Sequence, residues 1–94
     1  MKPFLTTITC LATLAAAENC QNTLNYCSFT LMGKGDYHQQ ILAALRLSSP
    51  PIDPSLVNYD YYLYRCDDKG EIHKTQNCPY GCQDGGSNES DRCI

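Results

Sequence analysis

The stretch that decides the fold is CPYGCQDGGSNESDRC, residues 78–93, which holds three of the chain's seven cysteines. Gly, Asn, Asp and Ser dominate this stretch, and such residues bury too little apolar surface to order a chain by packing alone. Disulfides therefore have to supply the constraint that a hydrophobic core supplies elsewhere. The sequence thus predicts a small domain held together by crosslinks.

The first 17 residues have the pattern of a secretory signal peptide. Lys2 is a short basic start, an apolar run covers residues 4–14, and three alanines end at Ala17. The run of about 11 residues is too short for a membrane anchor, which needs about 20. We predict a signal peptide over residues 1–17, cleaved after Ala17, and a single secreted, extracellular domain over residues 18–94.

Six cysteines remain once Cys10 is lost with the signal peptide. An even number in a short secreted chain implies three disulfides. Fifteen pairings are open for Cys20, Cys27, Cys66, Cys78, Cys82 and Cys93. We predict the pairs Cys27–Cys66, Cys82–Cys93 and Cys20–Cys78, in which the first joins two strands, the second closes the final loop and the third fastens the N-terminal arm.

The charge of the mature chain is acidic. Removing 17 of 94 residues leaves 77, with six Lys and Arg against ten Asp and Glu, a formal net charge of -4. Such a chain is not attracted unspecifically to nucleic acid or to anionic membranes. We expect no nucleic-acid partner, no membrane partner and a monomer.

Periodicity and turn signals predict an α+β domain in which one helix packs on a short antiparallel sheet. Alternating apolar residues predict a first strand over residues 26–31. Asp36 is expected to cap a helix, because Gln39 completes a capping-box pattern. The apolar face of this helix contains Tyr37, Ile41, Ala44 and Leu45, and residues 48–51, with their two prolines, end it.

We expect the second half of the chain to form a β-hairpin. Aromatic residues favour a strand over residues 59–66, a turn is expected over residues 67–70, and a partner strand over residues 71–75. Tyr62 and Tyr64 are expected on the face of Cys66, in the core. No regular periodicity follows Cys78, so the ending is expected to be an exposed loop clamped by its disulfide.

Several motifs together resemble a family of small secreted cysteine-rich proteins from filamentous ascomycete fungi. They are LNYC at residues 24–27, GDY at residues 35–37, LYRC at residues 63–66 and, at the C-terminus, Gly81-Cys82-Gln83-Asp84-Gly85-Gly86 with Ser90-Asp91-Arg92-Cys93. The match spans nearly the whole mature chain, and its most specific part is the ending. The resemblance implies a candidate effector, a virulence-associated protein released at the surface of a host or competitor. It implies no catalytic residues.

Catalysis and metal binding are the first alternatives. The two histidines, His38 and His73, with Glu71, Arg65 and a tyrosine, have the residue types of a small secreted ribonuclease. Cys78, Cys82 and His73 have approximate zinc spacing, but oxidised cysteines offer no thiolates. Asp84, Asn88, Glu89 and Asp91 do not follow the ligand order of known calcium loops. We therefore predict no catalytic residues, no metal site and no cofactor.

Recognition and glycosylation are the remaining candidates. Asn88-Glu89-Ser90 is an acceptor triplet for an N-linked glycan at Asn88. Tyrosines combine a large contact area with a polar tip, which suits protein or sugar surfaces, and we expect Tyr59 and Tyr61 to be the surface-binding pair.

The leading hypothesis is a non-enzymatic secreted interaction protein, a fungal effector candidate that binds an unknown extracellular or host protein, with a glycan as a secondary target. The alternative is a toxin-like or antimicrobial protein, although such proteins tend to be basic. A small secreted ribonuclease is third.

Overall fold

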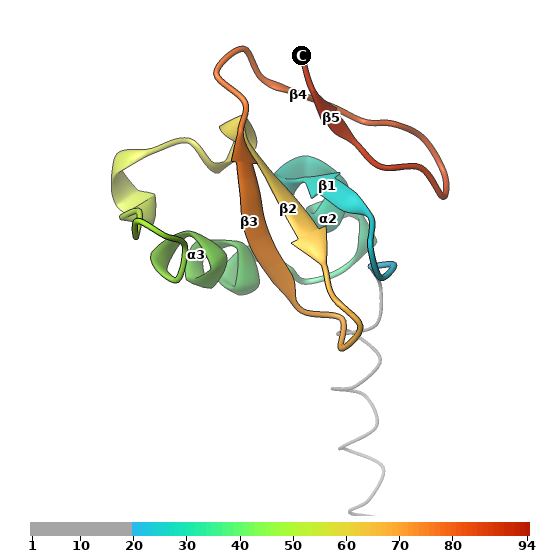
Figure 1. Ribbon diagram of the computed structural model, residues 1–94, viewed down its shortest axis with the longest axis horizontal. Coiled ribbons are helices and arrows are strands. Elements are labelled where there is room, and N and C mark those ends of the chain that lie inside the picture. Colours follow the sequence, from blue (N-terminus) through green and yellow to red (C-terminus); the bar gives the residue numbers. More distant parts are fainter. Residues whose placement is uncertain (1–19) are drawn as a thin grey trace, which may run out of the picture.

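The computed structural model describes residues 20–94, so the predicted signal peptide and its cleavage site lie outside the described residues. Over these residues the domain combines two α-helices with antiparallel strands and three disulfides, which confirms the predicted α+β class (Figure 1). The helices are α2 (Ser28–Lys34) and α3 (His38–Arg46), and two 3-10 turns follow them, η2 (Pro54–Leu56) and η3 (Tyr59–Tyr61). The strands are β1 (Asn25–Cys27), β2 (Tyr62–Cys66), β3 (Ile72–Asn77), β4 (Cys82–Gln83) and β5 (Arg92–Cys93).

The main sheet has three antiparallel strands in the order β1-β2-β3, and the predicted hairpin of β2 and β3 is confirmed. The register places Tyr26 opposite Tyr64 and Cys27 opposite Leu63. Successive side chains of a strand point to opposite faces of its sheet. The two tyrosines therefore share one face, whereas Cys27 and Leu63 share the other.

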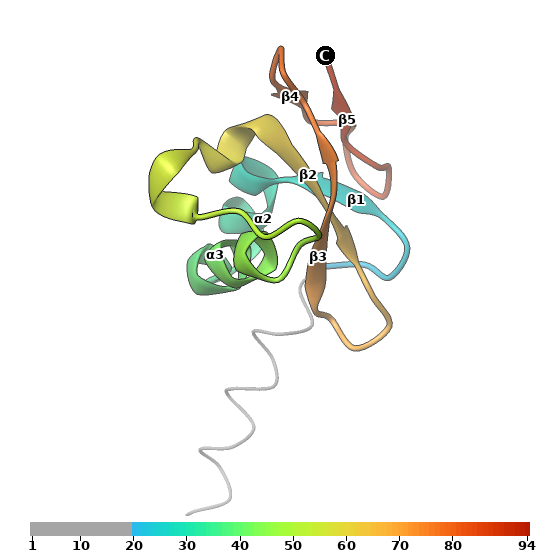
Figure 2. The same ribbon diagram turned by 60° about the vertical axis from the view of Figure 1, so that its left-hand side comes forward.

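The helices cover the tyrosine face and form the larger core (Figure 2). As the sequence predicted, Tyr37 and the apolar stripe of α3 are buried, and so are Tyr64 and Cys66. We call this region the helix-side core. Its buried members are Cys20, Tyr26, Leu31, Tyr37, Ile41, Ala44, Leu45, Tyr64, Cys66 and Ile72.

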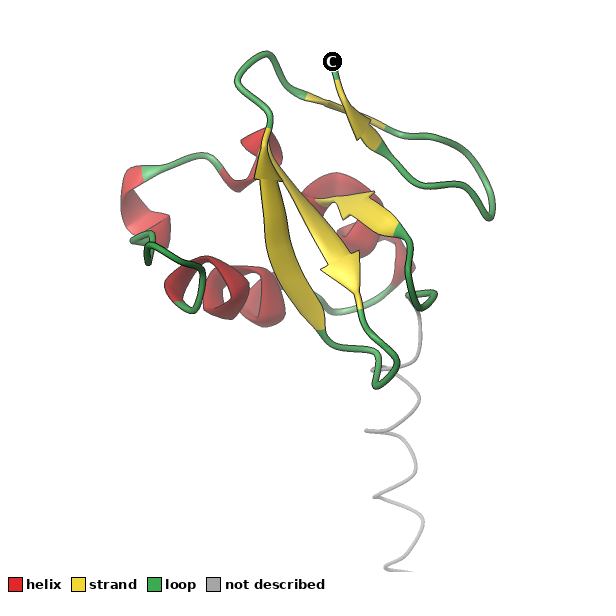
Figure 3. Ribbon diagram, in the orientation of Figure 1, coloured by secondary structure: helices red, strands yellow, loops and turns green. Residues whose placement is uncertain are grey.

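The opposite face of the sheet carries a second, smaller layer. Strands β4 and β5 form a separate two-stranded sheet, which lies beside β1 and the start of β2 (Figure 3). Its contacts bury Cys27, Leu63 and Cys78, with Cys82 and Cys93 partly buried around them. We call this region the cystine layer. Because the cystine layer covers the face of β2 opposite the helices, Leu63 is only 2 % exposed.

Three local predictions were wrong. The strand predicted over residues 59–66 begins only at Tyr62, because Tyr59–Tyr61 form the 3-10 turn η3. The first strand does not continue through residues 26–31, because β1 ends at Cys27 and Ser28 begins α2. Residues two apart share one face of a strand but point in different directions from a helix. Leu31 is therefore buried, whereas Phe29 is 45 % exposed. Helix α3 begins at His38 without a side-chain cap, so Asp36 does not have the predicted capping role.

All three predicted cysteine pairs were wrong. The observed disulfides are Cys20–Cys66, Cys27–Cys82 and Cys78–Cys93. Cys27 cannot reach Cys66, because the register sets it opposite Leu63 with its side chain on the other face of the sheet. Cys82 and Cys93 do face each other across β4 and β5, but each bonds to a cysteine outside this small sheet.

Candidate functional site

The C-terminal signature has a structural explanation in Asp91, a carboxylate that is only 3 % exposed. Its Oδ2 accepts a hydrogen bond from the Cys27 N–H at 2.8 Å, and its Oδ1 accepts one from the Gly85 N–H at 2.7 Å. Hydrogen bonds to a buried charged group are stronger than neutral ones. Asp91 therefore ties the loop between β4 and β5 to the edge of β1.

The same loop also forms hydrogen bonds with Asn25 on the edge of β1. The Asn25 N–H donates to Ser90 Oγ at 3.0 Å, and the Asn25 carbonyl accepts from the Asp91 N–H at 2.9 Å. Gly85 allows this close approach, since a Cβ atom there would lie 2.0 Å from the Ser90 carbonyl oxygen. The Asp-Gly-Gly and Ser-Asp-x-Cys motifs thus satisfy backbone groups that an exposed edge strand would leave unpaired.

A group of three side chains with metal-ligating atoms lies at the turn between β2 and β3. Asp67, Glu71 and His73 each offer a ligand atom, and these atoms all lie within 4.8 Å of one another. We call them the turn cluster. Asp67 Oδ2 and His73 Nε2 are 2.8 Å apart, and Asp67 Oδ1 accepts hydrogen bonds of 2.9 Å from the N–H groups of Lys69 and Glu71.

These contacts lower the pKa of the Asp67 carboxyl to about 2, the largest cause being the hydrogen bond with His73 and the next the two backbone N–H groups. Asp67 is therefore ionised at any physiological pH. This cluster was not predicted from the sequence, because contact across a turn depends on how the turn closes. The signal available was two acidic residues and a histidine flanking an Asp-Lys-Gly turn.

A cavity of about 640 Å³ lies beside the turn cluster, between α3 and the start of β3. Ala43, Ala44 and Leu47 line it from the helix side. Glu71 and His73 line it from the hairpin. Small-molecule sites have volumes of about 300 to 1,000 Å³, so the cavity is of a size to receive a ligand or a partner side chain.

Four large apolar side chains are exposed on segments that the disulfide Cys78–Cys93 and nearby hydrogen bonds link to one another. The exposed fractions are 45 % for Phe29, 49 % for Tyr61, 82 % for Tyr80 and 67 % for Ile94. We call these four residues the aromatic end. Three hydrogen bonds bring their segments together: Cys78 N–H to the Tyr61 carbonyl, Ile94 N–H to the Gly81 carbonyl, and the Ser28 hydroxyl to the Asp60 carboxylate.

The two tyrosines predicted to bind occupy different environments. Tyr61 belongs to the aromatic end. Tyr59 is half-buried against the helix-side core, and its ring meets the His38 ring edge to face at 5.8 Å between centroids. Tyr61 therefore offers more surface to a partner, while the binding role of the pair stays a prediction.

Asn88, the predicted glycosylation site, is exposed on the loop between β4 and β5. Its Oδ1 accepts a hydrogen bond of 2.7 Å from Gln21 Nε2, and its φ of 62° is one that asparagine tolerates well. Attachment of a glycan stays a prediction.

The structure gives the residues of the ribonuclease hypothesis different partners. His73 bonds to Asp67 and lies opposite Arg65 across β2 and β3, whereas His38 meets Tyr59 at the start of α3. The zinc alternative of Cys78, Cys82 and His73 fails because both cysteines form disulfides. Of the four residues weighed as a calcium loop, Asp91 already uses both carboxylate oxygens on backbone N–H groups.

Comparison with known proteins gave no match to a family model, a curated protein or a solved structure. The resemblance to the fungal family therefore stays a prediction. Across residues 20–94, no helix combines the length and the apolar character needed to span a membrane. With three disulfides in one small domain, the chain is a disulfide-rich protein of the extracellular type.

Proposed function

We propose that this protein is a secreted, non-enzymatic interaction protein, a fungal effector candidate that binds a protein of a host or competitor. The aromatic end carries this proposal. Large apolar side chains that stay exposed on a rigid frame are typical of protein-binding surfaces. Tyrosine is also among the residues that contribute most to binding energy at such surfaces.

The frame under the aromatic end is suited to recognition without rearrangement. Cys78 is fully buried, and its disulfide to Cys93 fixes the segments that hold Tyr80 and Ile94. The Tyr61 carbonyl bonds to the Cys78 N–H at 2.7 Å, which holds η3 against the same disulfide. A surface ordered before binding loses little conformational entropy when a partner docks.

Affinity capture with the oxidised, secreted protein tests the proposal. We expect extracts of a host or competitor to yield a specific protein partner, and Tyr61→Ala and Tyr80→Ala to weaken its capture by about 10-fold or more, as interface hot spots do. Leu56→Ala is the matched control, because Leu56 is 79 % exposed on η2. Equal capture by all variants, or no saturable partner, would contradict the proposal.

The antimicrobial and ribonuclease alternatives make separate predictions. Growth inhibition of other microbes by the oxidised protein favours the toxin-like function. Cleavage of RNA that is lost in His73→Ala favours the enzyme. An interaction protein shows neither activity.

A further inference from the structure

We propose that the turn cluster binds a divalent transition-metal ion of the zinc type, with a ring nitrogen of His73 and the carboxylates of Asp67 and Glu71 as ligands. This site is independent of the aromatic end and of any protein partner. Its three ligand atoms lie within 4.8 Å of one another.

The donors have a spacing that suits a bound metal ion. Zinc lies about 2.0 to 2.2 Å from imidazole nitrogen and carboxylate oxygen, so neighbouring ligands are roughly 3 Å apart. Asp67 Oδ2 and His73 Nε2 already lie 2.8 Å apart. A metal ion can therefore take the place of the proton between these two atoms with only a small adjustment of the side chains.

Asp67 is held in position before any ion arrives. The N–H groups of Lys69 and Glu71 both donate to its Oδ1, which directs Oδ2 toward His73. The turn beneath is closed by hydrogen bonds from the Asp67 N–H to the Glu71 carbonyl at 2.8 Å and from the Gly70 N–H to the Asp67 carbonyl at 3.2 Å. Such outer hydrogen bonds orient a ligand and strengthen metal binding.

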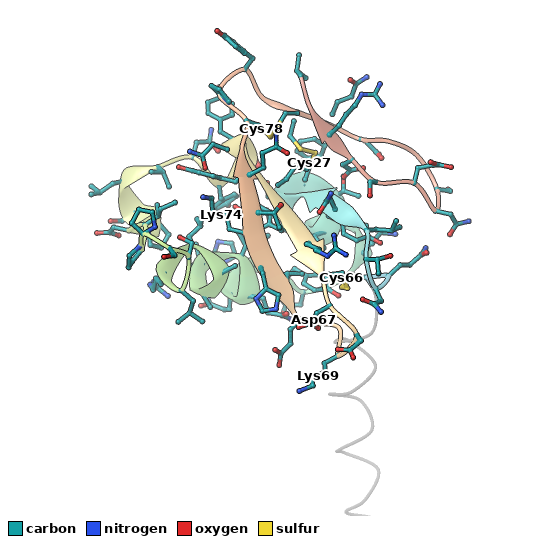
Figure 4. The ribbon with its side chains drawn as sticks, viewed as in Figure 1. Cys27, Cys66, Asp67, Lys69, Lys74 and Cys78 are labelled. Atoms are coloured by element: carbon teal, nitrogen blue, oxygen red, sulfur yellow. A yellow bond between two sulfur atoms is a disulfide. The ribbon has the colours of Figure 1, made fainter. Side chains whose placement is uncertain are left out.

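Lysine and arginine do not compete for the two carboxylates of the turn cluster. Asp67 forms its ion pair with His73, and neither Asp67 nor Glu71 forms an ion pair with a lysine or arginine of residues 20–94. Arg65 lies opposite His73 in the sheet, and Lys69 is in the turn itself. The Lys69 side chain extends from the tip of the hairpin into solvent (Figure 4).

The donor set decides the class of ion. Calcium and magnesium prefer oxygen ligands alone, whereas imidazole with carboxylates suits zinc and its neighbours. The His73 side chain is 61 % exposed and that of Asp67 30 %, so water can complete the coordination. Because Glu71 and His73 also line the cavity of about 640 Å³, the ion would lie at the rim of that cavity.

Calorimetric titration of the oxidised, metal-free protein with Zn²⁺ tests the site. We expect one ion to bind per chain, and His73→Ala to weaken binding by about 10-fold or more, at least the effect of losing an outer-shell partner. His38→Ala is the matched control, because it removes the other exposed histidine from a different element. A parallel titration with Ca²⁺ is expected to show much weaker binding.

Amide chemical shifts locate the ion independently of affinity. We expect Zn²⁺ to shift the amides of residues 67–73 and to leave those of the loop at residues 84–91 unchanged. The same spectra establish that His73→Ala is folded. The proposal is overturned if no single-site binding is found, if His73→Ala and His38→Ala weaken binding equally, or if Ca²⁺ binds as tightly as Zn²⁺.

Discussion

The two faces of the main sheet are stabilised in different ways. The helix-side core buries tyrosine, leucine and isoleucine from both helices and all three strands. In the cystine layer the one fully apolar side chain among the described residues is Leu63, and the remaining members are cysteines. Packing therefore dominates on one face, whereas crosslinks and the buried carboxylate of Asp91 dominate on the other.

This difference explains how so short an ending can be ordered. Strands β4 and β5 have two residues each and offer few ladder hydrogen bonds. An isolated two-stranded hairpin is marginal even when longer. The disulfides Cys27–Cys82 and Cys78–Cys93 supply the missing constraint, and four hydrogen bonds involving Ser90 and Asp91 direct the loop onto β1 and Gly85.

The largest effect is expected from removing the disulfide that joins the two layers. The double change Cys27→Ala with Cys82→Ala is expected to lower the free energy of unfolding by about 4 kcal/mol, from the entropy of the released loop. Hydrogen exchange should then show residues 82–93 losing protection well before α3 does. Denaturant unfolding measures the total loss.

The matched control is Cys20→Ala with Cys66→Ala, which releases a loop of similar length, 46 residues of separation against 55. A comparable loss of about 4 kcal/mol is expected from loop entropy. Here both cysteines belong to the helix-side core, so protection should fall in α3 and the sheet together. Identical exchange patterns in the two variants would refute the distinction between the faces.

Gly85→Ala is expected to have the next largest effect. Its Cβ would overlap the Ser90 carbonyl, and forced overpacking costs up to about 3 kcal/mol. Gly33→Ala in α2 is the control, since nothing lies within 4 Å of its Cβ and alanine favours a helix by about 0.5 to 1 kcal/mol. Thermal unfolding should show opposite shifts, and equal shifts would contradict the assigned role of Gly85.

Asp91→Ala is expected to cost about 2 kcal/mol, because it leaves the N–H groups of Cys27 and Gly85 without an acceptor. The increase in hydrogen exchange should be confined to β1 and the C-terminal loop. Asp84→Ala is the control, since the exposed Asp84 carboxylate accepts one local hydrogen bond, from the Gly86 N–H. A loss in Asp84→Ala as large as in Asp91→Ala would show that the buried carboxylate has no special role.

The helix-side core was the predictable part of the fold. The burial of Ile41, Ala44 and Leu45 follows from helical spacing, and the hairpin of β2 and β3 follows from an aromatic run that ends at an Asp-Asp-Lys-Gly turn. Both signals are local in sequence. The first strand failed because Phe29 and Leu31 fit an alternating pattern over too few residues to separate a strand from a helix.

The cystine layer was not predictable in the same way. Disulfide pairing depends on which face of the sheet each cysteine occupies, and that depends on a register set by residues far apart in sequence. A single observation, Cys27 opposite Leu63, would have excluded the pair Cys27–Cys66. The turn cluster was missed for the same reason, and of the aromatic end Tyr61 alone was predicted, since contacts between segments distant in the sequence bring these residues together.

The effect expected to be smallest at neutral pH is that of the buried hydroxyl of Tyr64, which tests the helix-side core alone. Burial raises the pKa of Tyr64 above its ordinary value of 10.0, and the hydroxyl donates to the Tyr59 carbonyl at 2.9 Å. Below pH 10 the hydroxyl is protonated in both folded and unfolded chains, so it causes no pH dependence of the free energy of unfolding. Above pH 10 the unfolded chain loses this proton first, so the free energy of unfolding falls by up to about 1.4 kcal/mol per pH unit.

Tyr64→Phe removes this titration and should flatten the alkaline decline measured by denaturant unfolding between about pH 10 and pH 12. Tyr80→Phe is the control, because Tyr80 is 82 % exposed, and its alkaline decline should match that of the unchanged protein. Parallel curves for Tyr64→Phe and the unchanged protein would mean that the buried hydroxyl does not govern alkaline stability. A flattened curve would show that the face held by packing is weakened by charging one side chain while every disulfide stays intact.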